Sequence, residues 1–381
     1  MTDMMKTKAY FLKMVASIIC EQPIPAYSTD INLQQLYKLA VKNSVQGILY
    51  LAIKNGNIPV NETFENNLRN MYMTFLMRDA AQEAERAFIS NKFSEENIDF
   101  MFLKGSHLKK LYPTPEIRYM VDMDVLIKKD DLEHGCHILL ENGFTQYMDN
   151  YKDVIFTKKP NITVELHQML FIDDYFMHDY FSDVWEKAVQ VSEHEYKMSD
   201  NDLYVYTLAH LAEHYLDGGS CFRPTMDLFL MERILGDKLD FTYINQQFKT
   251  IGIDKFAEKI RLLYNCMFAD GEYNDDLTTM ENYIVLGAPV KDVASVAKVA
   301  SSKQSKMSRI ITTLFPKYAH MVARYPLLKK VPLLLPFFWL KRIFRLLFTK
   351  NEGMIKKRKD LINTDSDSVD IMREIFEKSG F

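Results

Sequence analysis

The run of residues 121–127, VDMDVLI, constrains the fold most strongly because aspartate alternates with apolar residues. In a β-strand, successive side chains point to opposite faces, so Asp122 and Asp124 share one face. Val121 and Met123 then point into a core. Two carboxylates on one face repel each other, and a folded chain rarely accepts that arrangement without a cation between them. The run therefore predicts a strand with a cation site on its outer face.

The segment before this run predicts a phosphate site. Residues 98–104, IDFMFLK, predict a strand that leads into Gly105 and Ser106 and then into a short helix over 107–111. A glycine-serine turn that opens a helix offers backbone N–H groups and a hydroxyl, which suit a phosphate. Lys104 precedes the glycine and is a further candidate for a phosphate contact. Together with the two aspartates, this turn indicates a site for a magnesium-bound nucleotide.

A third acidic residue lies on a predicted β-hairpin. Residues 154–157 and 162–167 predict its two strands, and the polar segment 158–161, KKPN, predicts the turn. Glu165 is the one carboxylate of this hairpin that lies among apolar strand residues, and it shares a face with His167. Three acids on adjacent strands beside a phosphate cradle are what two-metal nucleotidyl transfer requires. His167 either supports these acids or is a buried, hydrogen-bonded histidine.

Four short motifs in this order resemble a known family. They are LKGS at 103–106, Arg118, DMDVLI at 122–127 and VELH at 164–167. This pattern is similar to the uncharacterised nucleotidyltransferases of the polymerase-beta-like superfamily. These proteins carry a Gly-Ser pair, an Asp-x-Asp strand and a third carboxylate on a neighbouring strand.

The resemblance implies roles for individual residues. Ser106 would contact the nucleotide phosphates. Asp122 and Asp124 would bind Mg²⁺, or Mn²⁺ in its place, and Glu165 would complete the acidic triad. Fifteen residues separate Ser106 from Asp122, more than this superfamily usually shows, and the insert contains Pro113. We interpret the insert as a longer loop.

The function implied is a metal-dependent nucleotidyltransferase. Such an enzyme moves a nucleoside monophosphate from an NTP to a hydroxyl of a small molecule, a protein or a tRNA, and releases pyrophosphate. The alternative is a catalytically idle nucleotide-binding protein of the same fold. The sequence leaves open the acceptor, the base preference and the oligomeric state.

Two arginines are further candidates. Arg118 lies four residues before Asp122 and is either a surface residue or a group that orients phosphate or the triad. Arg223 is predicted at a helix start, with Pro224 at a favoured first position. Arg223 and Asp227 form either a simple ion pair or a pair that faces the nucleotide. The pair resembles a motif of abortive-infection-type nucleotidyltransferase toxins, although the lysine that those proteins favour is absent.

The segment His210-Leu-Ala-Glu213-His214 matches the inverted zinc-peptidase signature. On a helix, the two histidines lie one turn apart on one face, as two zinc ligands do. A peptidase also needs a third ligand, so this interpretation ranks low. The other interpretations are two histidines at a helical interface, or a place beside the nucleotide.

Helical periodicity outside the motif region predicts an α+β fold with a small mixed-sheet core between helical regions. We predict an N-terminal helical region over 1–96 and a catalytic core over 97–198. A C-terminal helical domain over 199–362 follows, and then a linker with a short helix over 363–381.

Composition favours a cytoplasmic protein. Four cysteines without a C-x-x-C spacing suggest neither a zinc knuckle nor a disulfide framework. The N-terminal region lacks a signal-peptide pattern, and no apolar run is long enough for a transmembrane helix.

The C-terminal part is basic. Residues 301–360 contain fifteen Lys or Arg and two Asp or Glu, although the whole chain has a net charge of −4. Within it lies the segment 326–348, and a helix that starts at Pro336 in this segment would be basic and amphipathic. We rank packing against the core first, RNA contact second and membrane contact, which is unlikely, third. The residues predicted to contact RNA phosphates are Lys341, Arg342, Arg345, Lys356, Lys357, Arg358 and Lys359.

Overall fold

The chain forms two compact units in the computed structural model. The first comprises residues Met1–Tyr215, Ser220–Gly287 and Lys378–Phe381, and the second comprises Leu216–Gly219 and Ala288–Glu377. The structure describes residues 3–173, 175–301, 314–315, 318, 321–322, 325, 327–348 and 365–381. All the candidate site residues around the acidic run belong to the first unit.

Four helices precede the sheet in the first unit. They are α1 (Asp3–Ile19), α2 (Leu33–Lys42), α3 (Gln46–Asn55) and α4 (Glu62–Glu95). The side chain of Asn61 caps α4 by accepting a hydrogen bond of 2.8 Å from the amide of Phe64. Such a cap satisfies one of the amides that a helix start leaves without a partner. The helical region predicted before the sheet is confirmed.

One mixed sheet of seven strands follows, in the order β3-β4-β5-β2-β1-β7-β6. The strands are β1 (Phe100–Phe102), β2 (Met123–Ile127), β3 (Thr145–Asp149), β4 (Asp153–Lys158), β5 (Ile162–His167), β6 (Val189–Gln190) and β7 (Glu195–Lys197). Between β1 and β2 lie α5 (Gly105–Leu108) and two 3₁₀ turns, Lys109–Leu111 and Pro115–Ile117. The α+β fold with helices on either side of a sheet core is confirmed.

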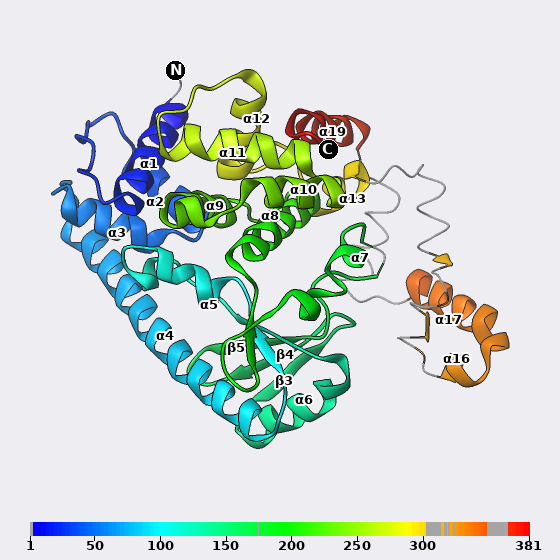
Figure 1. Ribbon diagram of the computed structural model, residues 1–381. Coiled ribbons are helices and arrows are strands. Elements are labelled where there is room, and N and C mark those ends of the chain that lie inside the picture. The colour runs from blue at the N-terminus through cyan, green and yellow to red at the C-terminus, as the bar shows by residue number, and fades with distance from the viewer. Residues whose placement is uncertain are drawn as a thin grey trace. The chain divides into compact units, whose positions relative to one another are not determined.

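The two faces of the sheet differ in character. On one face, Val125 of β2 and Val164 of β5 are fully buried in a core with Phe93 of α4 and Leu139 of α6 (Leu132–Glu141). Figure 1 shows α4 and α6 on this side of the sheet. Alternation along the strands leaves the acidic residues for the other face. One prediction is wrong here: Val121 is 46% exposed, because β2 begins only at Met123.

The predicted hairpin is confirmed in detail. β4 and β5 pair in antiparallel fashion, from Asp153 opposite His167 to Lys158 opposite Ile162. The helix before the hairpin is α6, and the chain turns at Gly143, whose φ of +82° lies in the region that favours glycine.

Helices complete both units. After the strands, the first unit contains α7 (His178–Phe181), α8 (Asp200–Asp217, whose last residues fall in the second unit), α9 (Phe222–Leu235), α10 (Phe241–Ile251), α11 (Asp254–Phe268) and α12 (Asp275–Leu286). The second unit contains α13 (Val293–Ser301), α16 (Leu327–Lys330), α17 (Leu335–Phe348) and most of α19 (Ser366–Ser379). In the described residues, no helix is both long enough and apolar enough to cross a membrane.

The predicted amphipathic helix is α17. Phe338, with Trp339 beside it, packs in a small cluster with Met321 and Leu328 of the same unit. Lys341 and Arg342 lie on this helix. Lys356, Lys357, Arg358, Lys359 and the side chain of Arg345 lie outside the described residues, so the RNA contact stays a prediction.

Candidate active site

Parallel pairing of β2 with β5 brings two of the predicted acids together. In this register, Asp124 lies opposite Glu165, and Leu126 lies opposite His167. Neighbouring strands are about 4.8 Å apart, so residues in register on one face are direct neighbours. The main-chain hydrogen bonds of the sheet therefore set the distance between these two carboxylates.

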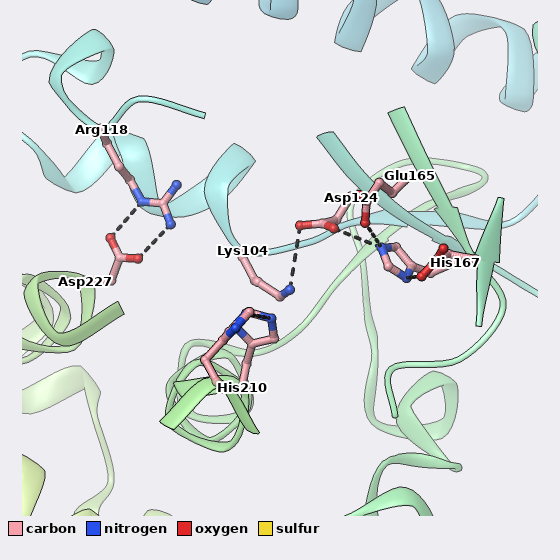
Figure 2. Close-up of polar contacts among 9 residues, drawn as sticks. Lys104, Arg118, Asp124, Glu165, His167, His210 and Asp227 are labelled. Carbon is pink, nitrogen blue, oxygen red and sulfur yellow. Dashed lines mark hydrogen bonds and ion pairs between the residues drawn. The ribbon is translucent and has the colours of Figure 1, made fainter. Parts of the chain in front are cut away.

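His167 joins the acids. Ligand atoms of Asp124, Glu165 and His167 lie within 4.8 Å of one another, close enough to hold one metal ion. The Nε2 atom of His167 is 2.9 Å from Oδ1 of Asp124 and 3.5 Å from Oε2 of Glu165. Burial lowers the pKa of His167, but these two carboxylates outweigh it and raise the pKa above its ordinary value. His167 is therefore suited to donate a hydrogen bond to Asp124 (Figure 2).

Asp122 lies beside this group, one residue before β2. It is not part of the three-residue set that the described residues form around Asp124. Burial raises the pKa of Asp122 to about 6, and the carboxylates of Asp124 and Glu165 add to the effect. Three carboxylates are thus close enough to repel one another, as the sequence predicted for a cation site.

Lys104 forms an ion pair with Asp124. Its Nζ atom lies 3.7 Å from Oδ2 of Asp124 and 5.4 Å from the centre of the Tyr206 ring. Burial lowers the pKa of Lys104, but the surrounding acidic groups, with Asp124 the strongest of them, together outweigh burial and raise the pKa. In Figure 2 its side chain points between Asp124 and His210. The backbone of Lys104 has a φ of +30°, which is strained for a residue with a side chain.

The Gly-Ser turn is tightly packed. Ser106 is buried, and its amide already donates a 3.3 Å hydrogen bond to the carbonyl of Leu103. A phosphate here would meet the Ser106 hydroxyl and nearby cations rather than that amide. A Cβ atom on Gly105 would lie 2.7 Å from Nη1 of Arg118, which explains why glycine is needed.

Arg118 is buried, so its interpretation as a surface residue is wrong. Its Nε and Nη2 atoms donate to the two carboxylate oxygens of Asp227, each at 2.7 Å. The Tyr112 hydroxyl donates to the same carboxylate at 2.8 Å. The predicted simple ion pair between Arg223 and Asp227 is wrong as well, because Asp227 pairs with Arg118 instead. This network ties the loop before β2 to α9 (Figure 2).

Arg223 uses its Nη1 atom to donate to the carbonyl oxygen of Tyr119. Burial lowers the pKa of Arg223, and the charge of Arg118 adds to this effect. The charge of Arg223 also acts on Asp122. Arg223 is therefore close enough to Asp122 to lower its pKa, and its contact with the nucleotide stays a prediction.

His210 and His214 contact each other, with 3.1 Å between their Nε2 atoms. Burial lowers the pKa of His214 to about 4 and lowers that of His210 well below its ordinary value, so both are neutral at pH 7. Among the described residues, no third histidine, cysteine or carboxylate joins them in a possible metal group. The zinc-peptidase arrangement is therefore not assembled in this part of the chain.

Two neighbours escaped prediction. The Asp153 carboxylate lies 3.8 Å from Nδ1 of His167, and Tyr206 lies under Lys104. The register of the β4–β5 hairpin, which sets Asp153 opposite His167, is the signal that would have found the first. Tyr206 lies on α8, far along the chain, and no local pattern marks it.

Comparison with known families agrees with this geometry. A family model described as uncharacterised nucleotidyltransferase matches residues 29–269, which include the whole sheet and α9. No curated protein and no solved structure matches the chain.

Proposed function

The chain belongs to the uncharacterised nucleotidyltransferase family, and we propose that it transfers a nucleoside monophosphate from an NTP to a hydroxyl acceptor. One observation carries the proposal. Asp124 and Glu165 lie in register on parallel strands, with Asp122 one residue before the strand of Asp124 and with Lys104 close to Asp124. Acids that face one another next to a cation are the groups that nucleotidyl transfer needs.

The donor set fits a hard divalent cation such as Mg²⁺ or Mn²⁺. Carboxylate oxygens are the ligands that these ions prefer, and Asp122, Asp124 and Glu165 would supply them. His167 fits better as a hydrogen-bond donor that fixes the orientation of Asp124. When bound, the metal would neutralise phosphate charge and lower the pKa of the attacking hydroxyl.

The nucleotide phosphates would meet three side chains. Lys104 and Arg223 both bring positive charge near Asp122, on which both act electrostatically. Ser106 would add its hydroxyl from the turn that follows Lys104. Because the site is largely buried, these charges act more strongly on the phosphates than they would in water.

The reaction is a substitution at the α-phosphorus of the NTP. A bond forms between the acceptor oxygen and this phosphorus, and the bond from the phosphorus to the bridging oxygen of the β-phosphate breaks. The bonding electrons leave with pyrophosphate. Glu165 would take the proton that the acceptor hydroxyl loses.

Label transfer tests the proposal. The full chain is incubated with each α-³²P-labelled NTP, Mg²⁺ or Mn²⁺ and a total cell extract, and labelled small molecules, proteins and RNA are separated. We expect label in one class of acceptor, and none with Asp124→Asn. Asp149→Asn, an exposed strand residue outside the site, is the matched control and retains activity. NTP binding without label transfer in every fraction would support the idle nucleotide-binding protein instead.

A further inference from the structure

A polar groove lies at one end of the strands that carry the acids. It has a volume of about 780 Å³, within the range of small-molecule sites. Its lining comes from α4, the segment after α6, and β3, β4 and β5. The lining residues are Arg78, Gly143, Thr145, Thr157, Lys158, Lys159, Asn161, Ile162 and Thr163.

Strand register connects the groove to the acidic group. Thr145, Thr157 and Thr163 lie opposite one another across β3, β4 and β5 and form a row of hydroxyls. Thr163 precedes Glu165 by two residues, so both point to the same face. The first pair of the β2–β5 register is Met123 with Val164. The same register, continued by one residue before this pair, sets Asp122 beside Thr163. The groove therefore begins where the proposed reaction takes place.

The groove attracts anions. Three of its lining residues are cations and none is acidic, as far as the described chain shows. Lys158 is neutralised by Glu85, at 2.8 Å. Arg78 donates to two uncharged oxygens, the Tyr119 hydroxyl and the Val121 carbonyl. Its positive charge is thus available to a ligand.

Lys159 adds a second available charge. It is exposed at the turn between β4 and β5, and no carboxylate of the described residues lies within 4.0 Å of its ammonium group. Two available cations beside a row of hydroxyls and the amide of Asn161 match a ligand with both phosphate and hydroxyl groups.

The lining also argues against recognition of bases. Proteins that hold single-stranded nucleic acid stack its bases on aromatic side chains. None of the described residues that line the groove is aromatic, and Ile162 is the one large apolar side chain among them. A phosphorylated sugar needs charge and hydrogen bonds but no stacking surface.

We propose that this groove binds a phosphorylated sugar, with its phosphate near Arg78 and Lys159 and a free hydroxyl directed to Glu165. The sugar is then the acceptor of the transfer, and this assignment rests on the proposed function. The row of threonines orients the sugar hydroxyls, while the two cations select the phosphorylated form over the neutral one.

Calorimetric binding to the full chain tests the groove without any turnover. The probes are ribose 5-phosphate and glucose 6-phosphate, each compared with its unphosphorylated sugar, and a ten-nucleotide RNA. We expect the phosphorylated sugars to bind at least about tenfold more tightly than the neutral ones, since hydrogen bonds to charged groups are the stronger ones. Lys159→Glu should weaken their binding by a similar factor. Lys129→Glu, an exposed charge reversal after β2, should leave it unchanged.

Thr157→Val adds a test that does not alter charge. It should weaken binding of the neutral and the phosphorylated sugar alike, with circular dichroism unchanged. Equal binding of phosphorylated and neutral sugars, or equal effects of the two lysine reversals, overturns the proposal. Tighter binding of RNA than of either sugar phosphate overturns it in favour of an RNA acceptor. If Lys159→Glu weakens the binding of sugar phosphates but the protein transfers no label, the assignment of the groove stands. The proposed transferase activity is then refuted instead.

Discussion

The buried pair of Arg118 and Asp227 allows a quantitative test of how the site is held. Arg118 is 8% exposed and Asp227 is 1% exposed, and two hydrogen bonds of 2.7 Å join them. Asp227→Asn keeps the shape of the side chain but leaves the guanidinium charge without a counter-charge. Breaking one partner of a buried pair costs about 3–5 kcal/mol, so we expect a loss of this size in the free energy of unfolding.

Removing the whole network should cost much less. The triple variant Arg118→Met, Asp227→Leu and Tyr112→Phe removes both charges of the pair and also the hydroxyl that Tyr112 would otherwise leave unpaired. Apolar replacements of buried ion pairs are often neutral or stabilising, so most of the loss should be recovered. The intermediate variant that keeps Tyr112 should lie about 1–3 kcal/mol below the triple variant.

Urea unfolding at pH 7 measures these differences. The chain contains two tryptophans, Trp185 in the first unit and Trp339 in the second. In a Trp339→Phe background, the fluorescence of Trp185 follows the unit that contains the network. A cost of Asp227→Asn below about 1 kcal/mol would refute the reasoning. So would a triple variant that is no more stable than the single one.

Three further results are expected. Asp122→Asn should reduce label transfer by about 100-fold or more while the melting temperature holds or rises, because burial and like charges already raise the pKa of this group. Asp124→Asn should reduce both label transfer and the melting temperature, because this carboxylate accepts a hydrogen bond from the buried His167. Equal melting temperatures for Asp122→Asn and Asp124→Asn would contradict this expectation. Below pH 6.5 the unfolded chain protonates His214 while the folded chain, with a pKa of about 4, does not. His214 alone should therefore lower the stability by about 1.4 kcal/mol for each unit that the pH falls, and urea unfolding of His214→Gln should show a shallower slope.

The sequence was sufficient to predict the local parts of the site. Alternation of aspartate with apolar residues placed Asp124 on an outer face, and alternation in the hairpin placed Glu165 likewise. Both predictions depend only on the direction of the side chains, which repeats every two residues within any single strand. The family follows from the same motifs, and the match over residues 29–269 confirms it.

These patterns do not predict contacts between segments that are far apart in the sequence. Asp227 is engaged by Arg118, 109 residues away, instead of the arginine four residues before it. A one-turn spacing on a helix makes a local pair plausible, but the buried guanidinium offers two hydrogen bonds at once, and that geometry prevails. The parallel register that brings His167 to Asp124 is likewise a property of the sheet and not of either strand.

The double pairing of β5 determines which changes of length this chain can accumulate over evolutionary time. β5 is bonded to β4 on one side and to β2 on the other. An insertion within the turn at 159–161 only lengthens a surface loop, because both registers are kept. A single insertion inside β5 before Glu165 would rotate this carboxylate into the core and expose an apolar residue in its place. Lineages of this protein can therefore change the length of the hairpin tip without altering either register, whereas the spacing between Ile162 and Glu165 must be inherited unchanged.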